Sequence, residues 1–339
     1  MSRRFLSKKP RLEDYWRAIV LFGQNVASYK FALAKSLLEL RPEAGQLVTL
    51  DELAKPFSRN IAAHLKKIDK QATSKSSKFL DACRDFNSGK VSEDQLIDQT
   101  VKLGFNNVID AFHIVGREPI EKSFFVDERK TQGGIKITDE FSMLAMTNHI
   151  GSLPAEAEAR WRLVETAWSL DISTNLLSIQ YDLPSEDLLV VSRENQRIPV
   201  TSSRDALNGY QKSRCFYCFR LISLSDDNLK PQVDHFFPHN LKKTGFDSLD
   251  GVWNLVLACR SCNGSGGKWA NVPHISYLAR LFTRNEFWIA SHHPLRETIL
   301  LQTGKTESLR GKFLQECHDY AITTVTHQWQ TDEVEEPTF

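Results

Sequence analysis

Residues 213–240 of this chain read SRCFYCFRLISLSDDNLKPQVDHFFPHN and place two cysteines three positions apart, followed by an Asp-His pair. Residues 251–269 read GVWNLVLACRSCNGSGGKW and carry a second pair of cysteines, with an asparagine before it and another directly after it. The chain has only six cysteines, so most of them stand in these two C-x2-C pairs. This pattern is the strongest signal in the sequence, and we expect it to decide the fold of the C-terminal half.

The two cysteine pairs have the spacing of a structural zinc site. Cys215 with Cys218 and Cys259 with Cys262 are separated by 40 residues. Two thiolates in one tight turn can occupy adjacent corners of a zinc tetrahedron, and a second pair can fill the other two corners. Such a closed shell leaves no position for substrate or water, so this Zn²⁺ would be structural. A disulfide or a set of free thiols is the alternative.

The composition is that of a globular protein, with 41% hydrophobic and 25% charged residues among 339 and a net charge of +1. Residues 1–70 carry 14 basic against 7 acidic side chains, which permits contact with nucleic acid but does not require it. No apolar run approaches the roughly 18 residues of a membrane span, and no targeting segment is evident. We therefore expect a cytoplasmic protein, in which reduced thiols favour metal binding over disulfides.

Hydrophobic periodicity predicts an α+β protein that is mostly α-helical. Apolar residues recur every three or four positions over residues 12–41, and TLDE at 49–52 and SEDQ at 92–95 have the form of capping boxes. Residues 124–138 and 187–201 each predict a short hairpin. The expected domains are a mostly helical region over 1–200, a cysteine-containing domain over 201–275, packed helices over 276–330 and an acidic, disordered tail over 331–339.

The residues between and beside the cysteine pairs carry a family resemblance. Asp234-His235 ends the strand-like segment LKPQVDHF, Pro238 follows, Asn254 comes 19 residues after His235, and Asn263 follows the last cysteine. In this order the motif resembles the HNH endonucleases of the ββα-metal nuclease superfamily, over roughly residues 213–270. The resemblance implies a ββα-metal (HNH) nuclease fold in the C-terminal half, held in shape by the four-cysteine zinc.

The same resemblance implies a role for each matching residue. His235 would be the general base that takes a proton from the attacking water. Asp234 and Asn263 would ligate a catalytic divalent cation, and their oxygen ligands favour Mg²⁺ or Mn²⁺. Asn254 would brace the loop and so fix the orientation of His235.

Two features depart from the family pattern. Glycines follow Asn263, where the family more often continues a charged helical turn, and they either delay the helix or form a backbone nest for phosphate. The final position of the motif is Asn rather than His, which favours Mg²⁺ further. Lys268, Arg260 and His239 are candidates for contact with the substrate phosphate, although solvated charges and an ordinary loop histidine explain them about as well.

The expected function is that of a metal-dependent endonuclease acting on DNA, with 5′-phosphate and 3′-hydroxyl products as the resemblance implies. Residues 1–200 would bind nucleic acid or a regulatory protein partner, as in a regulated nuclease effector of bacterial defence or restriction. One alternative is a non-catalytic zinc module that binds nucleic acid or protein. Another is a nuclease of the same superfamily that acts on RNA or only nicks DNA.

Overall fold

The computed structural model describes residues 10–22, 27–74, 76–115, 118–147, 150–169, 179–191, 197–244, 249–291, 293–325 and 327–339. The chain divides into two compact units, Lys8–Asp171 and Ile172–Phe339. The sheet that contains residues 187–201 belongs to the second unit, together with the cysteines. The α+β class is confirmed, with about 51% helix and small sheets that are mainly antiparallel.

The N-terminal unit is mostly helical, with one three-stranded sheet in the order β1-β5-β4. Its elements are α1 (Leu12–Leu21), α2 (Tyr29–Leu40), β1 (Leu47–Thr49), α3 (Leu50–Leu65), α4 (Lys78–Asn87), α5 (Glu93–Leu103), α6 (Val108–Ala111), β2 (Ile114–Val115), β3 (Glu118–Pro119), β4 (Phe125–Glu128), β5 (Gly134–Ile137), α7 (Asp139–Ala145), the 3-10 helix η1 (Ile150–Ser152) and α8 (Leu153–Ser169).

The local signals of the sequence locate several of these elements. Thr49 and Ser92 cap α3 and α5, and each forms the predicted capping box. The hairpin at 124–138 forms as β4 and β5, and Gly133 takes a left-handed φ of 74° in the turn between them. The apolar segment over 12–41 forms two helices, α1 and α2, rather than one.

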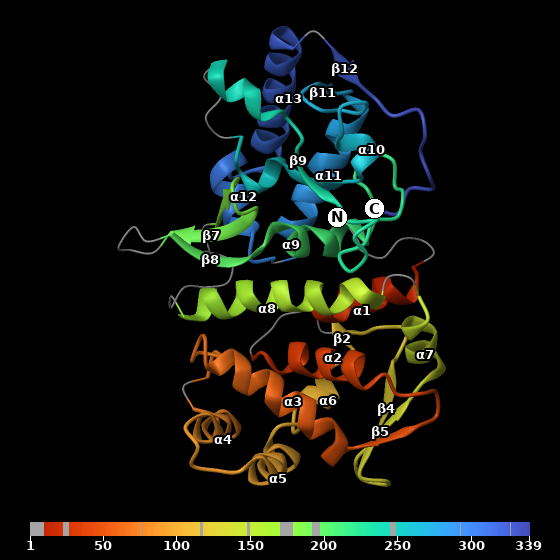
Figure 1. The fold of residues 1–339 in the computed structure, drawn as a ribbon, viewed down its shortest axis with the longest axis vertical. Helices are drawn as coiled ribbons and strands as arrows, with labels where there is room; N and C mark the ends of the chain where they lie inside the picture. The colour runs from red at the N-terminus through yellow and green to blue at the C-terminus, as the bar shows by residue number, and fades with distance from the viewer. Residues whose placement is uncertain are drawn as a thin grey trace. The chain divides into compact units, whose positions relative to one another are not determined.

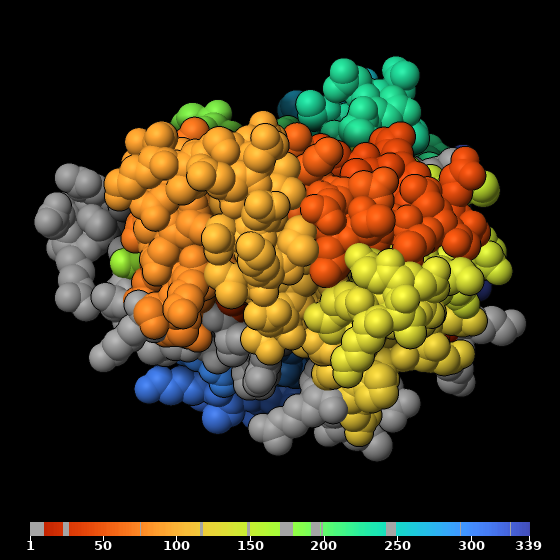
Figure 2. Space-filling model, turned by 90° about the horizontal axis from the view of Figure 1, so that it is seen from below, coloured from red at the N-terminus to blue at the C-terminus, as the bar shows by residue number. Residues whose placement is uncertain are grey.

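The core of this unit is rich in aromatic side chains and includes a buried ion pair between α1 and α8. Trp16 packs edge-on against the rings of Phe112 and Phe124. Arg17 of α1 lies 2.7 Å from the carboxylate of Glu156 of α8, and both side chains are 1% exposed. Figure 2 shows the surface above this core, where the orange helical segment and the yellow segment around the β4–β5 hairpin form one continuous face.

The C-terminal unit contains the cysteines and the HNH-like motif, and Figure 1 labels many of its helices and strands. Its elements are β6 (Ile179–Asp182), β7 (Asp187–Val191), β8 (Arg197–Ser202), α9 (Ser203–Gln211), β9 (Gln232–His235), the 3-10 helices η3 (His239–Thr244) and η4 (Val252–Asn254), β10 (Leu255–Ala258), α10 (Arg260–Asn263), β11 (Val272–Pro273), α11 (Ser276–Ala290), α12 (Arg296–Thr303), α13 (Glu307–Thr324) and β12 (Gln328–Trp329).

β9 and β10 form an antiparallel pair, and α10 follows directly, so the chain runs strand, strand, helix through the motif. All four residues of β10 are fully buried, which fixes the pair in the core of the unit. Arg284 of α11 is also fully buried and donates hydrogen bonds to the carbonyl oxygens of Trp253 and Leu255. Helix α11 thereby holds the strand that pairs with His235.

Among the described residues, no helix combines the length and the apolar character needed to cross a membrane.

Candidate functional site

The four paired cysteines form one buried cluster in which all sulfur atoms lie within 4.8 Å of one another. The sulfurs of Cys218 and Cys259 are 3.7 Å apart, and all six cysteines of the chain are free rather than disulfide-bonded. A tetrahedral zinc with bonds of about 2.3 Å to sulfur requires sulfur atoms about 3.8 Å apart. The cluster therefore has the size of a four-thiolate zinc shell.

Two tight backbone segments bring the cysteines together. In the first, the Cys215 amide donates to the carbonyl of Arg220 (2.9 Å), and Phe219 takes a left-handed φ of 59° that closes the turn. In the second, Cys259 precedes α10, and the Cys262 amide donates back to the Cys259 carbonyl (3.1 Å). Each C-x2-C pair thus occupies one turn of chain, as its spacing predicts.

The charge of the cluster also favours a bound cation. Burial raises the pKa of the Cys215 thiol, so a lone thiolate is costly there. A divalent zinc would remove this cost because a coordinating thiol is deprotonated outright. Four thiolate ligands would fill the shell, which fits a structural ion and leaves no position for a reacting water.

Asp234 and His235 end strand β9, and their side chains lie on opposite faces of it because they are adjacent in a strand. On the inner face, the Tyr217 hydroxyl donates to Oδ2 of Asp234 (2.5 Å) and the Lys268 ammonium donates to Oδ1 (2.8 Å). Lys268 is fully buried and Asp234 is 6% exposed. Both carboxylate oxygens of Asp234 are therefore used within the protein.

Burial raises the pKa of Asp234, and the nearby Lys268 ammonium and Tyr217 hydroxyl act in the opposite direction. Lys268 also donates to the carbonyl oxygen of His235 at 2.8 Å. This second bond makes Lys268 a link between the glycine loop and the end of β9. Because its ammonium is enclosed, Lys268 does not lie where a substrate phosphate could reach it, contrary to one of our expectations.

Asn263 is held by a different partner from Asp234. Its side-chain amide donates to Oε1 of Gln232 at 3.1 Å, two residues before Asp234 on β9. Helix α10 ends at Asn263 because the glycine loop folds back, and a Cβ on Gly267 would lie 2.3 Å from the Ser261 carbonyl oxygen. Each oxygen of Asp234 thus already accepts a hydrogen bond from the protein, and the Asn263 side chain contacts Gln232.

Asn254 is fully buried, and its side chain makes three hydrogen bonds to the backbone. Its side-chain oxygen accepts from the Phe237 amide (2.8 Å), and its side-chain nitrogen donates to the carbonyls of Phe237 (3.0 Å) and Leu249 (2.9 Å). These three bonds join the backbone just after His235 to the chain that leads into β10.

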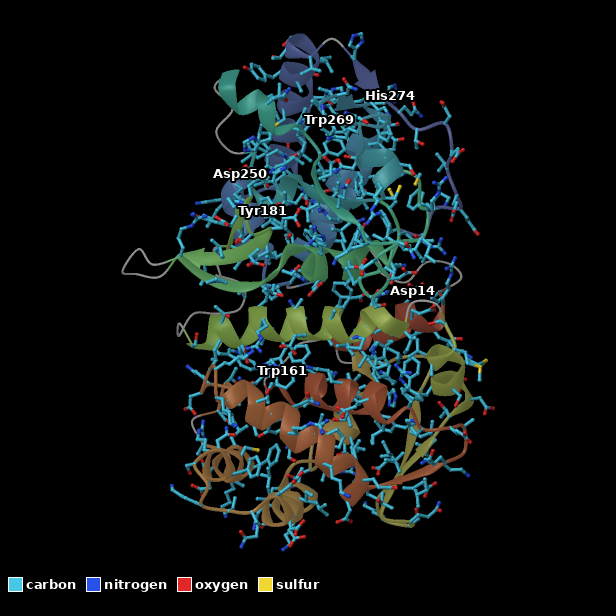
Figure 3. All side chains as sticks on the ribbon, in the orientation of Figure 1. Asp14, Trp161, Tyr181, Asp250, Trp269 and His274 are labelled. Atoms are coloured by element: carbon cyan, nitrogen blue, oxygen red, sulfur yellow. The ribbon has the colours of Figure 1, made fainter. Side chains whose placement is uncertain are left out.

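His235 lies on the other face of β9, beside two groups that the motif does not include. The Tyr181 ring of β6 packs edge-on against the imidazole, with 5.5 Å between ring centroids. Asp250 places Oδ1 3.5 Å from Nε2 of His235 and 3.5 Å from Nε2 of His239. Figure 3 shows Tyr181 and Asp250 together on this side of the unit. Burial raises the pKa of Tyr181, and the charges of Glu186 and Asp250 add to this shift.

Of the two other residues predicted to contact substrate, His239 lies beside His235, whereas Arg260 contacts a different part of the chain. His239 is 45% exposed at its side chain and lies beside His235, with 5.5 Å between the ring centroids. Arg260 is exposed and donates to the backbone oxygen of Asp227 at 3.0 Å. Sequence reasoning missed Asp250, Tyr181 and Tyr217 because no motif or periodicity marks them.

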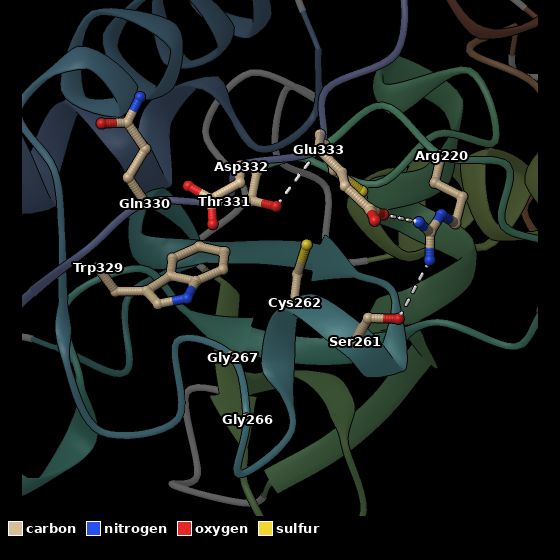
Figure 4. Close-up of a pocket in the computed structure, with 11 residues that line it drawn as sticks. Arg220, Ser261, Cys262, Gly266, Gly267, Trp329, Gln330, Thr331, Asp332 and Glu333 are labelled. Atoms are coloured by element: carbon tan, nitrogen blue, oxygen red, sulfur yellow. Dashed lines mark hydrogen bonds and ion pairs between the residues drawn. The ribbon is translucent and has the colours of Figure 1, made fainter.

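The C-terminal tail lies against the cysteine turn. The Glu335 amide donates to the Cys218 carbonyl (2.8 Å), and the Phe339 ring lies 4.9 Å from that of Phe219. Figure 4 shows a small pocket beside the cysteines, in which Arg220 contacts Glu333 of the tail and Ser261 of α10. The composition of the tail is acidic, and its one aromatic residue, Phe339, packs on the rings of Phe216 and Phe219.

Comparison with protein-family models, with curated proteins and with solved structures finds no match for this chain. The resemblance to the HNH endonucleases therefore rests on the motif residues themselves.

Proposed function

We propose that this chain is a phosphodiester-hydrolysing nuclease of the HNH type, with a structural zinc and with His235 as the general base. The observation that carries the proposal is the placement of His235 at the end of β9, inside a strand-strand-helix segment whose two ends hold the cysteine cluster. Without a metal, so small a segment has little core of its own to fix a catalytic side chain. The cysteine cluster would supply that fixation.

In the proposed reaction, His235 takes a proton from a water molecule as the water attacks phosphorus. The bond from phosphorus to the 3′-oxygen breaks, the 3′-oxygen takes a proton from bulk water, and His235 returns its proton to solvent, leaving 5′-phosphate and 3′-hydroxyl ends. The side chains of Asp250 and His239 are 38% and 45% exposed, so substrate would approach His235 from their side. The most suitable substrate is DNA, because the family pattern points to it.

A catalytic Mg²⁺ or Mn²⁺ belongs to the family pattern, but the arrangement of Asp234 and Asn263 does not fit one. Asp234 is buried and both of its oxygens accept hydrogen bonds from the protein. We therefore assign only proton transfer, to His235, and no step to a cation. The N-terminal unit would bind a regulatory partner or further nucleic acid, as in a nuclease effector of bacterial defence.

The engaged state of Asp234 also favours a second candidate, a non-catalytic zinc module that binds nucleic acid or protein. In that case the Tyr217–Asp234–Lys268 contacts would simply stabilise the unit, and His235 would have no reaction to serve. The two candidates make opposite predictions for cleavage.

The test uses full-length protein, a labelled DNA duplex and an RNA of the same sequence, each with Mg²⁺, with Mn²⁺ or with EDTA. The His235→Gln variant should lose cleavage at unchanged zinc content. A matched control is His274→Gln, since His274 belongs to the same unit and its imidazole contacts the Ser276 hydroxyl. Binding without cleavage by the wild type and both variants would favour the zinc module and contradict the nuclease.

A further inference from the structure

We propose that Asp250 is a positioning residue for His235, and that it, rather than Asp234, is the carboxylate that serves the proposed reaction. A role of Asp250 in catalysis rests on the proposed function, that is, on nuclease activity with His235 as the base. Its geometric basis is the contact of one carboxylate oxygen, Oδ1 of Asp250, with Nε2 of His235 and Nε2 of His239, each at 3.5 Å.

The two carboxylates beside His235 lie on different sides of β9. Asp234 faces the interior, where Tyr217 and Lys268 occupy both of its oxygens. Asp250 lies on the same side of β9 as the His235 imidazole, and 38% of the Asp250 side chain is exposed. A substrate that reaches the His235 imidazole would therefore meet the Asp250 side of the strand and not the Asp234 side.

The contact with Asp250 would select one tautomer of His235. A carboxylate near Nε2 favours the proton on that nitrogen, so in the proposed reaction Nδ1 would be the atom that takes the proton from water. Both contacting atoms, Nε2 of His235 and Oδ1 of Asp250, are shielded from solvent. The separation of 3.5 Å is long for a hydrogen bond, and such contacts commonly tighten when substrate binds.

The backbone around Asp250 is fixed by the residue that also fixes His235. The side-chain nitrogen of Asn254 donates to the Leu249 carbonyl (2.9 Å), and the backbone amide of Asn254 donates to the Gly251 carbonyl (2.9 Å). These bonds fall on the two neighbours of Asp250. Since the same asparagine also binds the backbone of Phe237, it sets the distance between the Asp250 loop and the end of β9.

Two further features hold this geometry. Gly251 must lack a side chain, because a Cβ there would lie 2.3 Å from the Trp253 ring. On the imidazole, the Tyr181 ring packs edge-on at an interplanar angle of 66° and limits rotation. The orientation of His235 is thus defined by Asp250 at Nε2 and by Tyr181 at its face.

The first arm of the test reads the tautomer directly and does not depend on catalysis. Full-length protein labelled with ¹⁵N at histidine is examined by NMR at about pH 8.5, where ordinary imidazoles are neutral. The His235→Gln variant identifies the His235 signals. We expect the Nε2–H form in the wild type and a shift of population towards Nδ1–H in Asp250→Ala. An unchanged tautomer in Asp250→Ala would overturn the proposal.

The second arm measures cleavage kinetics for Asp250→Ala, Asp250→Asn and a control, Asp227→Ala, whose side chain is 95% exposed. Loss of an orienting partner typically costs about 10- to 100-fold, so kcat of Asp250→Ala should fall by that factor with KM within about twofold. Asp250→Asn keeps an acceptor oxygen and should recover part of the loss. A wild type that cuts nothing would refute the proposed function while the tautomer result still decides the role of Asp250.

Discussion

The Lys268 ammonium lies 2.8 Å from Oδ1 of Asp234 and 2.8 Å from the carbonyl oxygen of His235, and it is fully enclosed by protein. This relationship gives the buried carboxylate its charge partner and ties the glycine loop to strand β9. It also assigns different roles to two adjacent motif residues. Asp234 stabilises the strand, and His235 at the end of the strand is the proposed base.

Replacing Lys268 with Met should destabilise the C-terminal unit strongly, because it leaves a buried carboxylate without its cation. Breaking one partner of a buried ion pair typically costs about 3–5 kcal/mol. The double variant Lys268→Met/Asp234→Asn should be more stable than Lys268→Met alone, since no charge remains unpaired. Urea unfolding of the three proteins measures this, and a double variant less stable than Lys268→Met would contradict the ion-pair account.

Removing one cysteine of the cluster should release zinc and unfold the segment that it holds. We expect Cys262→Ser to lose the roughly one zinc per chain of the wild type, because a structural site needs all four ligands. Cys317→Ala is the control, since Cys317 is a buried free cysteine outside the cluster. Elemental analysis and thermal unfolding provide the measurement. Full zinc content in Cys262→Ser would show that the cluster is not the zinc site.

The C-terminal tail should stabilise the cysteine turn through its aromatic anchor more than through its charges. Glu333 and Glu335 are 79% and 52% exposed at their side chains, and exposed ion pairs contribute at most about 1 kcal/mol. Phe339 packs against three rings, those of Tyr210, Phe216 and Phe219, and an aromatic pair is worth about 0.5–1.5 kcal/mol in addition to the apolar area that it buries.

Zinc transfer to a coloured chelator should therefore be faster in Phe339→Ala than in the wild type, and little changed in Glu335→Gln. The opposite ranking of the two variants would mean that the charges hold the tail.

His113 should make the N-terminal unit less stable in mild acid. Burial lowers the pKa of His113 from 6.5 to about 4, and its Nε2 accepts a hydrogen bond from the Phe124 amide, which requires that nitrogen unprotonated. The unfolded chain therefore binds more protons than the folded unit below pH 6.5. The free energy of unfolding of this unit should therefore be about 3 kcal/mol lower at about pH 4 than at pH 7.

Hydrogen exchange of the β4–β5 hairpin, corrected for the intrinsic rate at each pH, would follow this loss. In His113→Gln the dependence on pH should be much flatter. An equally steep loss in that variant would assign the effect to other groups.

The parts of the fold that could be predicted from the sequence are those specified by residues close to one another along the chain. The capping box of Thr49 and Glu52, the hairpin turn at Gly133 and the cysteine spacing each specify a conformation within a few positions, and all three form. The contacts of the tail have no such local signal, because Phe339 packs on residues more than a hundred positions away.

The site was predictable only in part, for the same reason. The motif indicated Asp234, His235 and Asn254, but not what each contacts. Tyr217 and Lys268 reach Asp234 from 17 and 34 residues away, and neither pairing has a local signature. Asp250 stands in a loop without periodicity, and only the fold brings it to His235.

The role of His235 is tested most directly by the rate at which full-length protein nicks supercoiled plasmid DNA, compared between the wild type and His235→Gln at equal zinc content. If His235 is the general base, the wild type nicks the plasmid and the variant is slower by at least about 100-fold, because general-base catalysis contributes about 10²–10⁴-fold. Equal rates for the two proteins, at equal zinc content, would show that His235 is not the base.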